Sequence, residues 1–213
     1  LRTALQNNEF LLHYQPKVNL ETNRMVGVEA LLRWNRNHSE MIPPNRFIGI
    51  AEDSGLIVEI GEWIMQTAFK DAVRWNTGRQ TPINVAINLS SRQFIHNNLL
   101  NVIKHLLKKT HCDPAWITFE ITESLLLNDS MHITKTLKSL DSLGFRISLD
   151  DFGTGYSALS YLNKFPVSEI KIDQSFVQGI ADNNDHRLIV QAIISMAKSL
   201  GKELVAEGVE TAE

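Results

Sequence analysis

Six residues with an acid, amide or amine side chain stand at the ends of six strand-like stretches of this sequence. They are Glu29, Asn88, Glu120, Asp150, Lys171 and Glu207. Carboxylate and amide oxygens are the ligands that hard divalent ions prefer, so this set favours Mg²⁺ or Mn²⁺ over zinc. A metal site built from oxygen ligands is the chemistry that these residue types could perform.

The stretch SLDDFGTGYSAL, residues 148–159, adds a second carboxylate, Asp151, directly after Asp150. Neighbouring side chains of a regular strand point to opposite faces. Both carboxylates can therefore face one site only if the strand ends there and the chain turns, which glycines at positions 153 and 155 permit. One carboxylate shared between two ions, with its neighbour on the second, suits a two-metal site for phosphodiester displacement. Lys171 could then orient or help deprotonate the attacking water, and Arg33 could bind a phosphate.

Strand-like and helix-like stretches alternate along the chain, which predicts an α/β fold with a parallel sheet and crossover helices. The seven expected strands are 10–18, 25–34, 83–90, 116–123, 145–151, 169–177 and 203–209. Apolar residues at helical spacing predict helices over 57–72, 99–107, 137–143 and 188–200, the last ending at Gly201. The five residues LETNR are too short for a crossover, so the first two strands should be antiparallel.

The expected strands have one apolar and one small or polar face. In 145–151, for example, Phe145, Ile147 and Leu149 alternate with Arg146, Ser148 and Asp150. If the sheet closes into a barrel, the polar faces line its interior and the six residues above reach the carboxyl ends of the strands. The active site of eight-stranded α/β barrels lies at that end. A single acid after a strand is usually a solvated residue or a helix cap. Six polar residues that all take the inward-facing position near the ends of six strands favour a common site.

The composition excludes several classes of protein. The 213 residues are 43% hydrophobic and carry a formal net charge of -3, which gives no basic field for DNA or RNA. The single cysteine, Cys112, cannot form an intramolecular disulfide and suits a reducing compartment. With no signal peptide and no apolar run of membrane-spanning length, we expect a cytoplasmic domain, whose parent protein could still be anchored to the inner membrane.

Seven sequence blocks in order resemble the EAL domain, a family of bacterial cyclic di-GMP phosphodiesterases. The blocks are YQPKVNLETNRMVGVEALLRW (14–34), IPPNRFIGIAEDSGLI (42–57), NLSSRQF (88–94), FEITES (119–124), DDFGTGYSALSYL (150–162), KIDQSFV (171–177) and AEGVET (206–211). The resemblance implies a TIM-like (β/α)8 barrel with an antiparallel first strand. It also implies hydrolysis of cyclic di-GMP to linear pGpG with two Mg²⁺ or Mn²⁺ ions.

The same resemblance implies roles for individual residues. Glu29, Asn88, Glu120 and Asp150 would hold one metal, and Asp150, Asp151 and Glu207 the other. Lys171 would lie beside the attacking water, so Lys171, Glu207 and Glu29 are the expected catalytic residues. Gln15 and Arg33 resemble substrate contacts. Glu123 resembles a glutamate that steadies the loop DFGTGYS, while Asp173 and Glu210 resemble supporting polar groups.

We expect residues 1–213 to be an EAL phosphodiesterase domain from a longer signalling protein. The start, LRTALQNNEF, looks like a helix that joins an upstream GGDEF or sensor module, and the family resemblance implies a homodimer. A C-terminal helix, an eighth strand and a glutamine that the family carries would be missing from the sequence.

Three other functions remain open from the sequence. A non-catalytic cyclic di-GMP receptor would bind the nucleotide without turnover, although receptors in the family typically lose acids that are all present here. An enolase-like metal enzyme would require paired lysines, of which KID supplies one. A structural scaffold would leave the clustered charges without a purpose.

Overall fold

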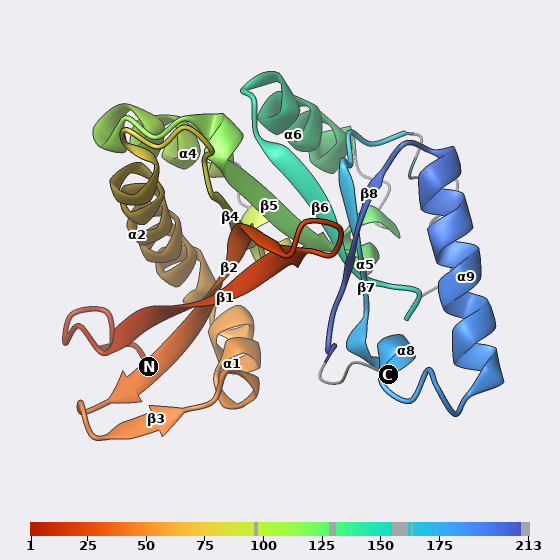
Figure 1. Cartoon of the computed structure of the whole chain (residues 1–213). Coiled ribbons are helices and arrows are strands. Elements are labelled where there is room, and N and C mark those ends of the chain that lie inside the picture. Colours follow the sequence, from red (N-terminus) through yellow and green to blue (C-terminus); the bar gives the residue numbers. More distant parts are fainter. Residues whose placement is uncertain (96–97, 128–130, 155–161, 163, 210–213) are drawn as a thin grey trace. The chain divides into compact units, whose positions relative to one another are not determined.

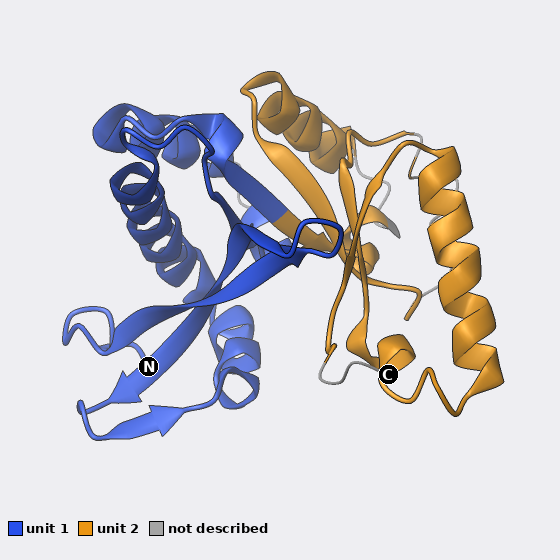
Figure 2. Ribbon diagram, in the orientation of Figure 1, with its two compact units in different colours: residues 1–119 blue, residues 120–213 orange. Residues whose placement is uncertain are grey.

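The computed structural model describes residues 1–95, 98–127, 131–154, 162 and 164–209, and it divides the chain into two compact units. The units comprise residues 1–119 and 120–213 (Figure 2). Strand β5 (Ile117–Thr122) contributes its first half to one unit and its second half to the other. Each unit alternates strands with helices (Figure 1), as the sequence pattern predicts.

The strands of the first unit follow the order β1-β2-β4-β5. Strand β1 (Phe10–Asn19) pairs antiparallel with β2 (Arg24–Arg36), which confirms the direction predicted from the short turn between them. Strand β4 (Asn84–Asn88) pairs parallel with β2. A short strand, β3 (Glu40–Ile42), also pairs antiparallel with β2. It was missed because three residues are too few to show an alternating pattern.

Helix α2 (Ile57–Asn76) supplies much of the apolar core of the first unit. The predicted stripe of Ile57, Ile60, Ile64, Ala68 and Ala72 is buried along its whole length. The ring of Phe69 also packs 6.5 Å from the ring of Phe119 on β5. Each buried Ile or Phe side chain contributes roughly 1.5–3 kcal/mol. The other helices of this unit are η1 (Pro44–Arg46), α1 (Ile48–Asp53), α3 (Ser91–Ile95), α4 (Leu99–Thr110) and η2 (Pro114–Trp116).

The last residue of α2 fixes where β4 begins. The Asn76 side chain donates from Nδ2 to the carbonyl of Ile83 at 2.9 Å, and its Oδ1 accepts from the Ile83 amide at 2.7 Å. Asn76 is buried, and both of its polar atoms are satisfied. The same contact thus anchors the strand that carries Asn88 at its other end.

The strands of the second unit follow the order β5-β6-β7-β8, in which β6 pairs parallel with β7 and β7 pairs parallel with β8. Its further strands are β6 (Arg146–Phe152), β7 (Glu169–Ile172) and β8 (Glu203–Ala206), and its helices are α5 (Glu123–Leu127), α6 (Met131–Ser142), α8 (Gln174–Val177) and α9 (Asn184–Ser199). Helix α9 packs on β7 and β8. Ile147, Leu149, Ile170 and Ile172 are buried, which confirms the predicted apolar faces of β6 and β7.

Local sequence signals set both ends of α9. The Asn183 side chain accepts hydrogen bonds from the amides of Asp185 and His186, so it caps the first turn. Gly201 adopts a φ of 64° after the last turn, and the Lys202 amide donates to the Ala197 carbonyl at 2.9 Å. This glycine end confirms the predicted stop. Among the described residues, no helix is both long enough and apolar enough to cross a membrane.

The thiol of Cys112 should be unreactive in the folded protein. Burial, with Asp113 nearby, raises its pKa to about 12. Since the thiolate is the reacting species, we expect native protein at pH 8 to react with a disulfide reagent at least about a hundredfold more slowly than protein unfolded in guanidinium. Cys112 is the only cysteine in the sequence, so the absorbance of the released thiol reports this residue alone. Equal rates would contradict the burial.

Candidate active site

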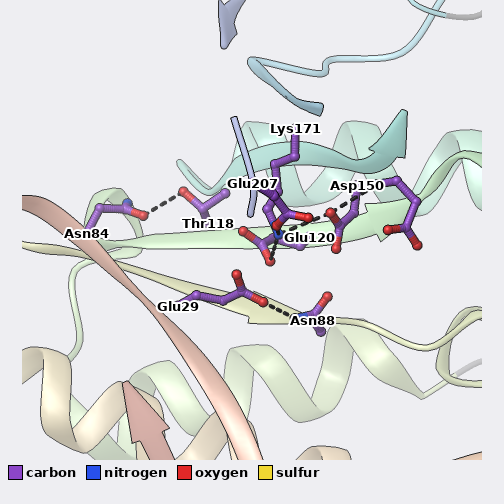
Figure 3. A network of polar contacts seen from close by, with 9 residues as sticks. Glu29, Asn84, Asn88, Thr118, Glu120, Asp150, Lys171 and Glu207 are labelled. Atoms are coloured by element: carbon purple, nitrogen blue, oxygen red, sulfur yellow. Dashed lines mark hydrogen bonds and ion pairs between the residues drawn. The ribbon is translucent and has the colours of Figure 1, made fainter. Parts of the chain in front are cut away.

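A buried lysine lies among three carboxylates in the second unit (Figure 3). The Nζ atom of Lys171 is 2.9 Å from Glu120 Oε2, 3.1 Å from Asp150 Oδ1 and 2.7 Å from Glu207 Oε1. Lys171 is 1% exposed and Glu120 is 0% exposed. Burying a charged group is unfavourable unless an opposite charge compensates it. The four side chains therefore form one mutually dependent cluster.

The parallel strands explain why these side chains meet. Strands β6, β7 and β8 are parallel neighbours, so their carboxyl ends lie along one edge, and β5 is the next strand beside β6. The neighbours of Lys171 on β7, Ile170 and Ile172, are buried on the apolar face, which leaves the lysine on the opposite face. Glu207 follows β8 directly, and its amide donates to the Ile172 carbonyl at 3.2 Å. This bond extends the ladder by one step and holds Glu207 next to the end of β7.

A β-bulge, rather than the end of the strand, brings the adjacent aspartates together. Strand β6 continues to Phe152, so the expectation that it ends at Asp151 is wrong. Leu149 pairs with Ile170 and Phe152 pairs with Ile172, so β6 has one more residue than β7 over this interval. Two residues of β6 therefore oppose one residue of β7. That single residue is the lysine of the cluster.

The backbone of Asp151 makes the bulge. Its φ is 54°, in the left-handed region that Asp tolerates better than most residues. Its amide donates to Asp150 Oδ1 at 3.0 Å, so the first carboxylate stabilises the turn that places the second. Gly153, with a φ of 99°, follows. The two acids can thus face one side without the strand ending.

Three acids of the second unit lie close enough to share a metal ion. Ligand oxygens of Asp150, Asp151 and Glu207 lie within 4.8 Å of one another. Partial burial raises the pKa of Asp151, and the nearby charges of Asp150 and Asp173 add to this, while Lys171 opposes it. A divalent ion would relieve this repulsion, and the donor set consists of oxygens alone. The cluster therefore fits a hard cation.

Two of the expected supporting residues have definite partners. Glu123 is 3% exposed, and its Oε2 accepts from the Gly153 amide at 3.3 Å, so it holds the chain just after the bulge. Asp173 caps α8 by accepting from the Ser175 amide at 2.9 Å. Glu210, the third expected supporting residue, lies outside the described residues.

The first unit brings together three more of the predicted site residues. Glu29 Oε1 accepts from Asn88 Nδ2 at 2.8 Å (Figure 3), and Gln15 pairs with Glu29 across the β1–β2 ladder. Arg33 lies on the same face of β2 as Glu29, four residues further on, and its Nη1 donates to the Leu32 carbonyl at 2.9 Å. The amide and the acid expected to bind metal are therefore direct partners on neighbouring strands.

The polar faces of β4 and β5 also contact each other further along these strands. Thr118 Oγ1 donates to Asn84 Oδ1 at 2.8 Å (Figure 3). Both residues occupy the faces that the sequence predicts to be polar. Thr118 is buried and Asn84 is half-buried, so this hydrogen bond gives the hydroxyl and the amide oxygen the partner that buried polar atoms need.

The turn after Asn88 is fixed by contacts that sequence reasoning missed. Gln93 is buried, and its Oε1 accepts from the Ser90 amide at 2.9 Å, while Ser90 Oγ donates to Glu52 Oε1 at 2.7 Å. Serine followed three residues later by glutamine is a capping-box pattern, and that pattern was the available signal. A Cβ at Gly61 would lie only 2.3 Å from Gln93 Nε2, so α2 needs a glycine there.

The fold and the acidic cluster define an α/β domain with a candidate metal centre. The family model described as EAL domain matches residues 1–213, and the chain belongs to the EAL domain family. It is 42% identical over 211 residues to the bifunctional diguanylate cyclase/cyclic di-GMP phosphodiesterase MucR of Pseudomonas aeruginosa, covering 99% of this chain and 31% of MucR. It is 37% identical over 213 residues to the cyclic di-GMP phosphodiesterase PdeR of Escherichia coli K12, covering 100% of this chain and 32% of PdeR.

The chain therefore spans less than a third of the length of these two curated relatives. Among solved structures, the PaMucR phosphodiesterase in complex with c-di-GMP matches with a TM-score of 0.94 at 42% identity. The match covers 99% of this chain and 85% of that chain. It confirms the predicted fold class, the α/β, TIM-like barrel of the family.

Replacing Gly61 by Ala should destabilise the first unit. The new methyl group would displace the buried Gln93 amide and break its hydrogen bond to Ser90, so we expect a loss of about 1–3 kcal/mol in the free energy of unfolding. Gly49→Ala is the matched control, because nothing lies within 4 Å of its Cβ position in helix α1. The control should be neutral or stabilise by up to about 1 kcal/mol. Urea unfolding of both variants measures this, and equal stabilities would contradict the packing at Gly61.

Proposed function

We propose that this chain hydrolyses one phosphodiester bond of cyclic di-GMP to give linear pGpG. The observation that carries the proposal is the edge of the second unit, where Lys171 is buried among three carboxylates and Asp151 lies beside them. Membership of the EAL domain family supports it, as do two relatives named as cyclic di-GMP phosphodiesterases, MucR and PdeR.

The proposed cofactors are two divalent ions, Mg²⁺ or Mn²⁺. We assign Glu29, Asn88, Glu120 and Asp150 to one ion, and Asp150, Asp151 and Glu207 to the other. The oxygen-only donors fit hard cations, and so does the charge of Asp150 beside Asp151, which adds to the burial that raises the pKa of Asp151. When bound, such ions neutralise the negative charge of a phosphodiester and polarise its oxygens.

The residues of the chain then have separate roles in the proposed reaction. Water adds to phosphorus as the bond from phosphorus to the 3′-oxygen breaks, and the proton of the water must pass to a base and then to that oxygen. Lys171 is proposed to orient the water and offset the negative charge of the transition state. Glu29 and Glu207 complete the catalytic group, and Gln15 and Arg33 bind the substrate, with Arg33 suited to a phosphate.

Other residues are proposed to support this arrangement. Glu123 holds the backbone after the bulge through Gly153, and Asp173 lies close enough to Asp151 to affect its pKa. Glu210 is proposed as a further polar support. We also propose that residues 1–213 act as one phosphodiesterase domain of a larger protein, since relatives carry names such as bifunctional diguanylate cyclase and oxygen sensor protein. The homodimer that the family resemblance implies is part of the same proposal.

Asp150→Asn should abolish most of the hydrolysis. It removes a charge from the position assigned to both ions, so we expect a decrease in kcat of roughly 10²–10³-fold, comparable to the loss of one electrostatic catalytic group. Glu21→Gln is the matched control, because Glu21 is an exposed acid in the turn between β1 and β2. Release of pGpG from cyclic di-GMP, followed by chromatography with Mg²⁺ or Mn²⁺, measures both variants.

The same assay separates an enzyme from a receptor. Tight binding of cyclic di-GMP by the unaltered protein, with no pGpG formed with either ion, would refute the proposed hydrolysis and identify a nucleotide receptor. Full activity in Asp150→Asn would instead refute the assignment of this residue.

A further inference from the structure

Lys171 and a divalent ion need the same carboxylate oxygens. Two ion-pair partners of Lys171, Asp150 and Glu207, also belong to the trio of acids whose oxygens lie within 4.8 Å of one another. The lysine pairs with them at 3.1 and 2.7 Å, which are distances of direct charge-assisted hydrogen bonds. A carboxylate oxygen that bonds an ammonium is a poorer ligand for a second cation.

The ammonium group is also well matched to its surroundings. It has three N–H donors, and oxygens of three carboxylates, from Glu120, Asp150 and Glu207, lie within 3.1 Å. Its neighbours on β7, Ile170 and Ile172, are buried on the other face of the strand, and Lys171 itself is 1% exposed. In this arrangement the ammonium of Lys171 lies within hydrogen-bond distance of three acids.

We propose that Lys171 is the internal counter-ion of the carboxylate cluster, that it competes with divalent ions for Asp150 and Glu207, and that metal binding releases it for its role in the reaction. This inference rests on the metal centre of the proposed function. It assigns Lys171 a second role, as the group that keeps the acids together before the ions bind. The charge balance supports it, because three acids contact the ammonium and Asp151 lies within 4.8 Å of two of them. A divalent ion that binds Asp150 and Glu207 must therefore compete with the lysine.

The test is the affinity for Mn²⁺ without any nucleotide. Lys171→Met removes the charge but keeps an unbranched side chain, so it should bind Mn²⁺ at least tenfold more tightly than the unaltered protein, which corresponds to about 1.4 kcal/mol. Lys171→Arg keeps the charge and is the matched control, with an affinity expected within threefold of the unaltered protein. Titration calorimetry measures all three. Unchanged or weaker binding by Lys171→Met, or no binding by any of them, would overturn the proposal.

A second measurement uses the unaltered protein, in case Lys171→Met does not fold. The ¹⁵N resonance of the Lys171 ammonium, assigned by its absence from the spectrum of Lys171→Arg, should shift on titration with Mg²⁺ as the lysine leaves Asp150 and Glu207. A resonance that does not move at saturating Mg²⁺ would refute the competition. A shifted resonance in a protein that forms no pGpG would support the counter-ion role and refute the proposed hydrolysis, so the two failures are distinguishable.

Discussion

The repulsion between carboxylates held at one edge of a sheet is the constraint on which the second unit depends. Two unit charges about 4 Å apart interact by about 4 kcal/mol at the effective dielectric constant near a protein surface. Acids at this spacing therefore require a cation, and Lys171 supplies one from β7. Partial burial raises the pKa of Asp151, and the charges of Asp150 and Asp173 raise it further, while Lys171 opposes this. The excess negative charge is what makes the edge suitable for divalent ions.

The two faces of each strand allow such a cluster to exist in a stable protein. Side chains such as Ile147, Leu149 and Ile170 bury apolar surface on one face, and this burial offsets the cost of grouping charges on the other. In the first unit the same division places Thr118 and Asn84 in contact while Phe119 packs on α2. Stability and chemistry are thus carried by alternate residues of the same strands.

Much of this arrangement follows from local pattern. Alternation identified the strands and their polar faces, and Gly201 identified the end of α9, because these signals depend on neighbouring residues only. The bulge at Asp151 could not be predicted, since it appears only when the register of β6 against β7 is known. The close approach of Gln93 to Gly61 could not be predicted either, because the two positions are 32 residues apart and meet only in the fold. Three ion-pair partners of Lys171 come from β5, from β6 and from the residue directly after β8, and their distances depend on the fold.

The bulge in β6 also bears on how members of such a family could gain or lose catalysis. Leu149 pairs with Ile170 and Phe152 pairs with Ile172, on either side of the extra residue. The extra residue is therefore not needed for these buried apolar side chains to pair. Deleting one codon at position 151 would restore an unbroken pairing and leave the apolar side of the strand intact, yet it would remove one acid. A member of such a family could then lose a candidate metal ligand through a single short deletion rather than through a rebuilt fold.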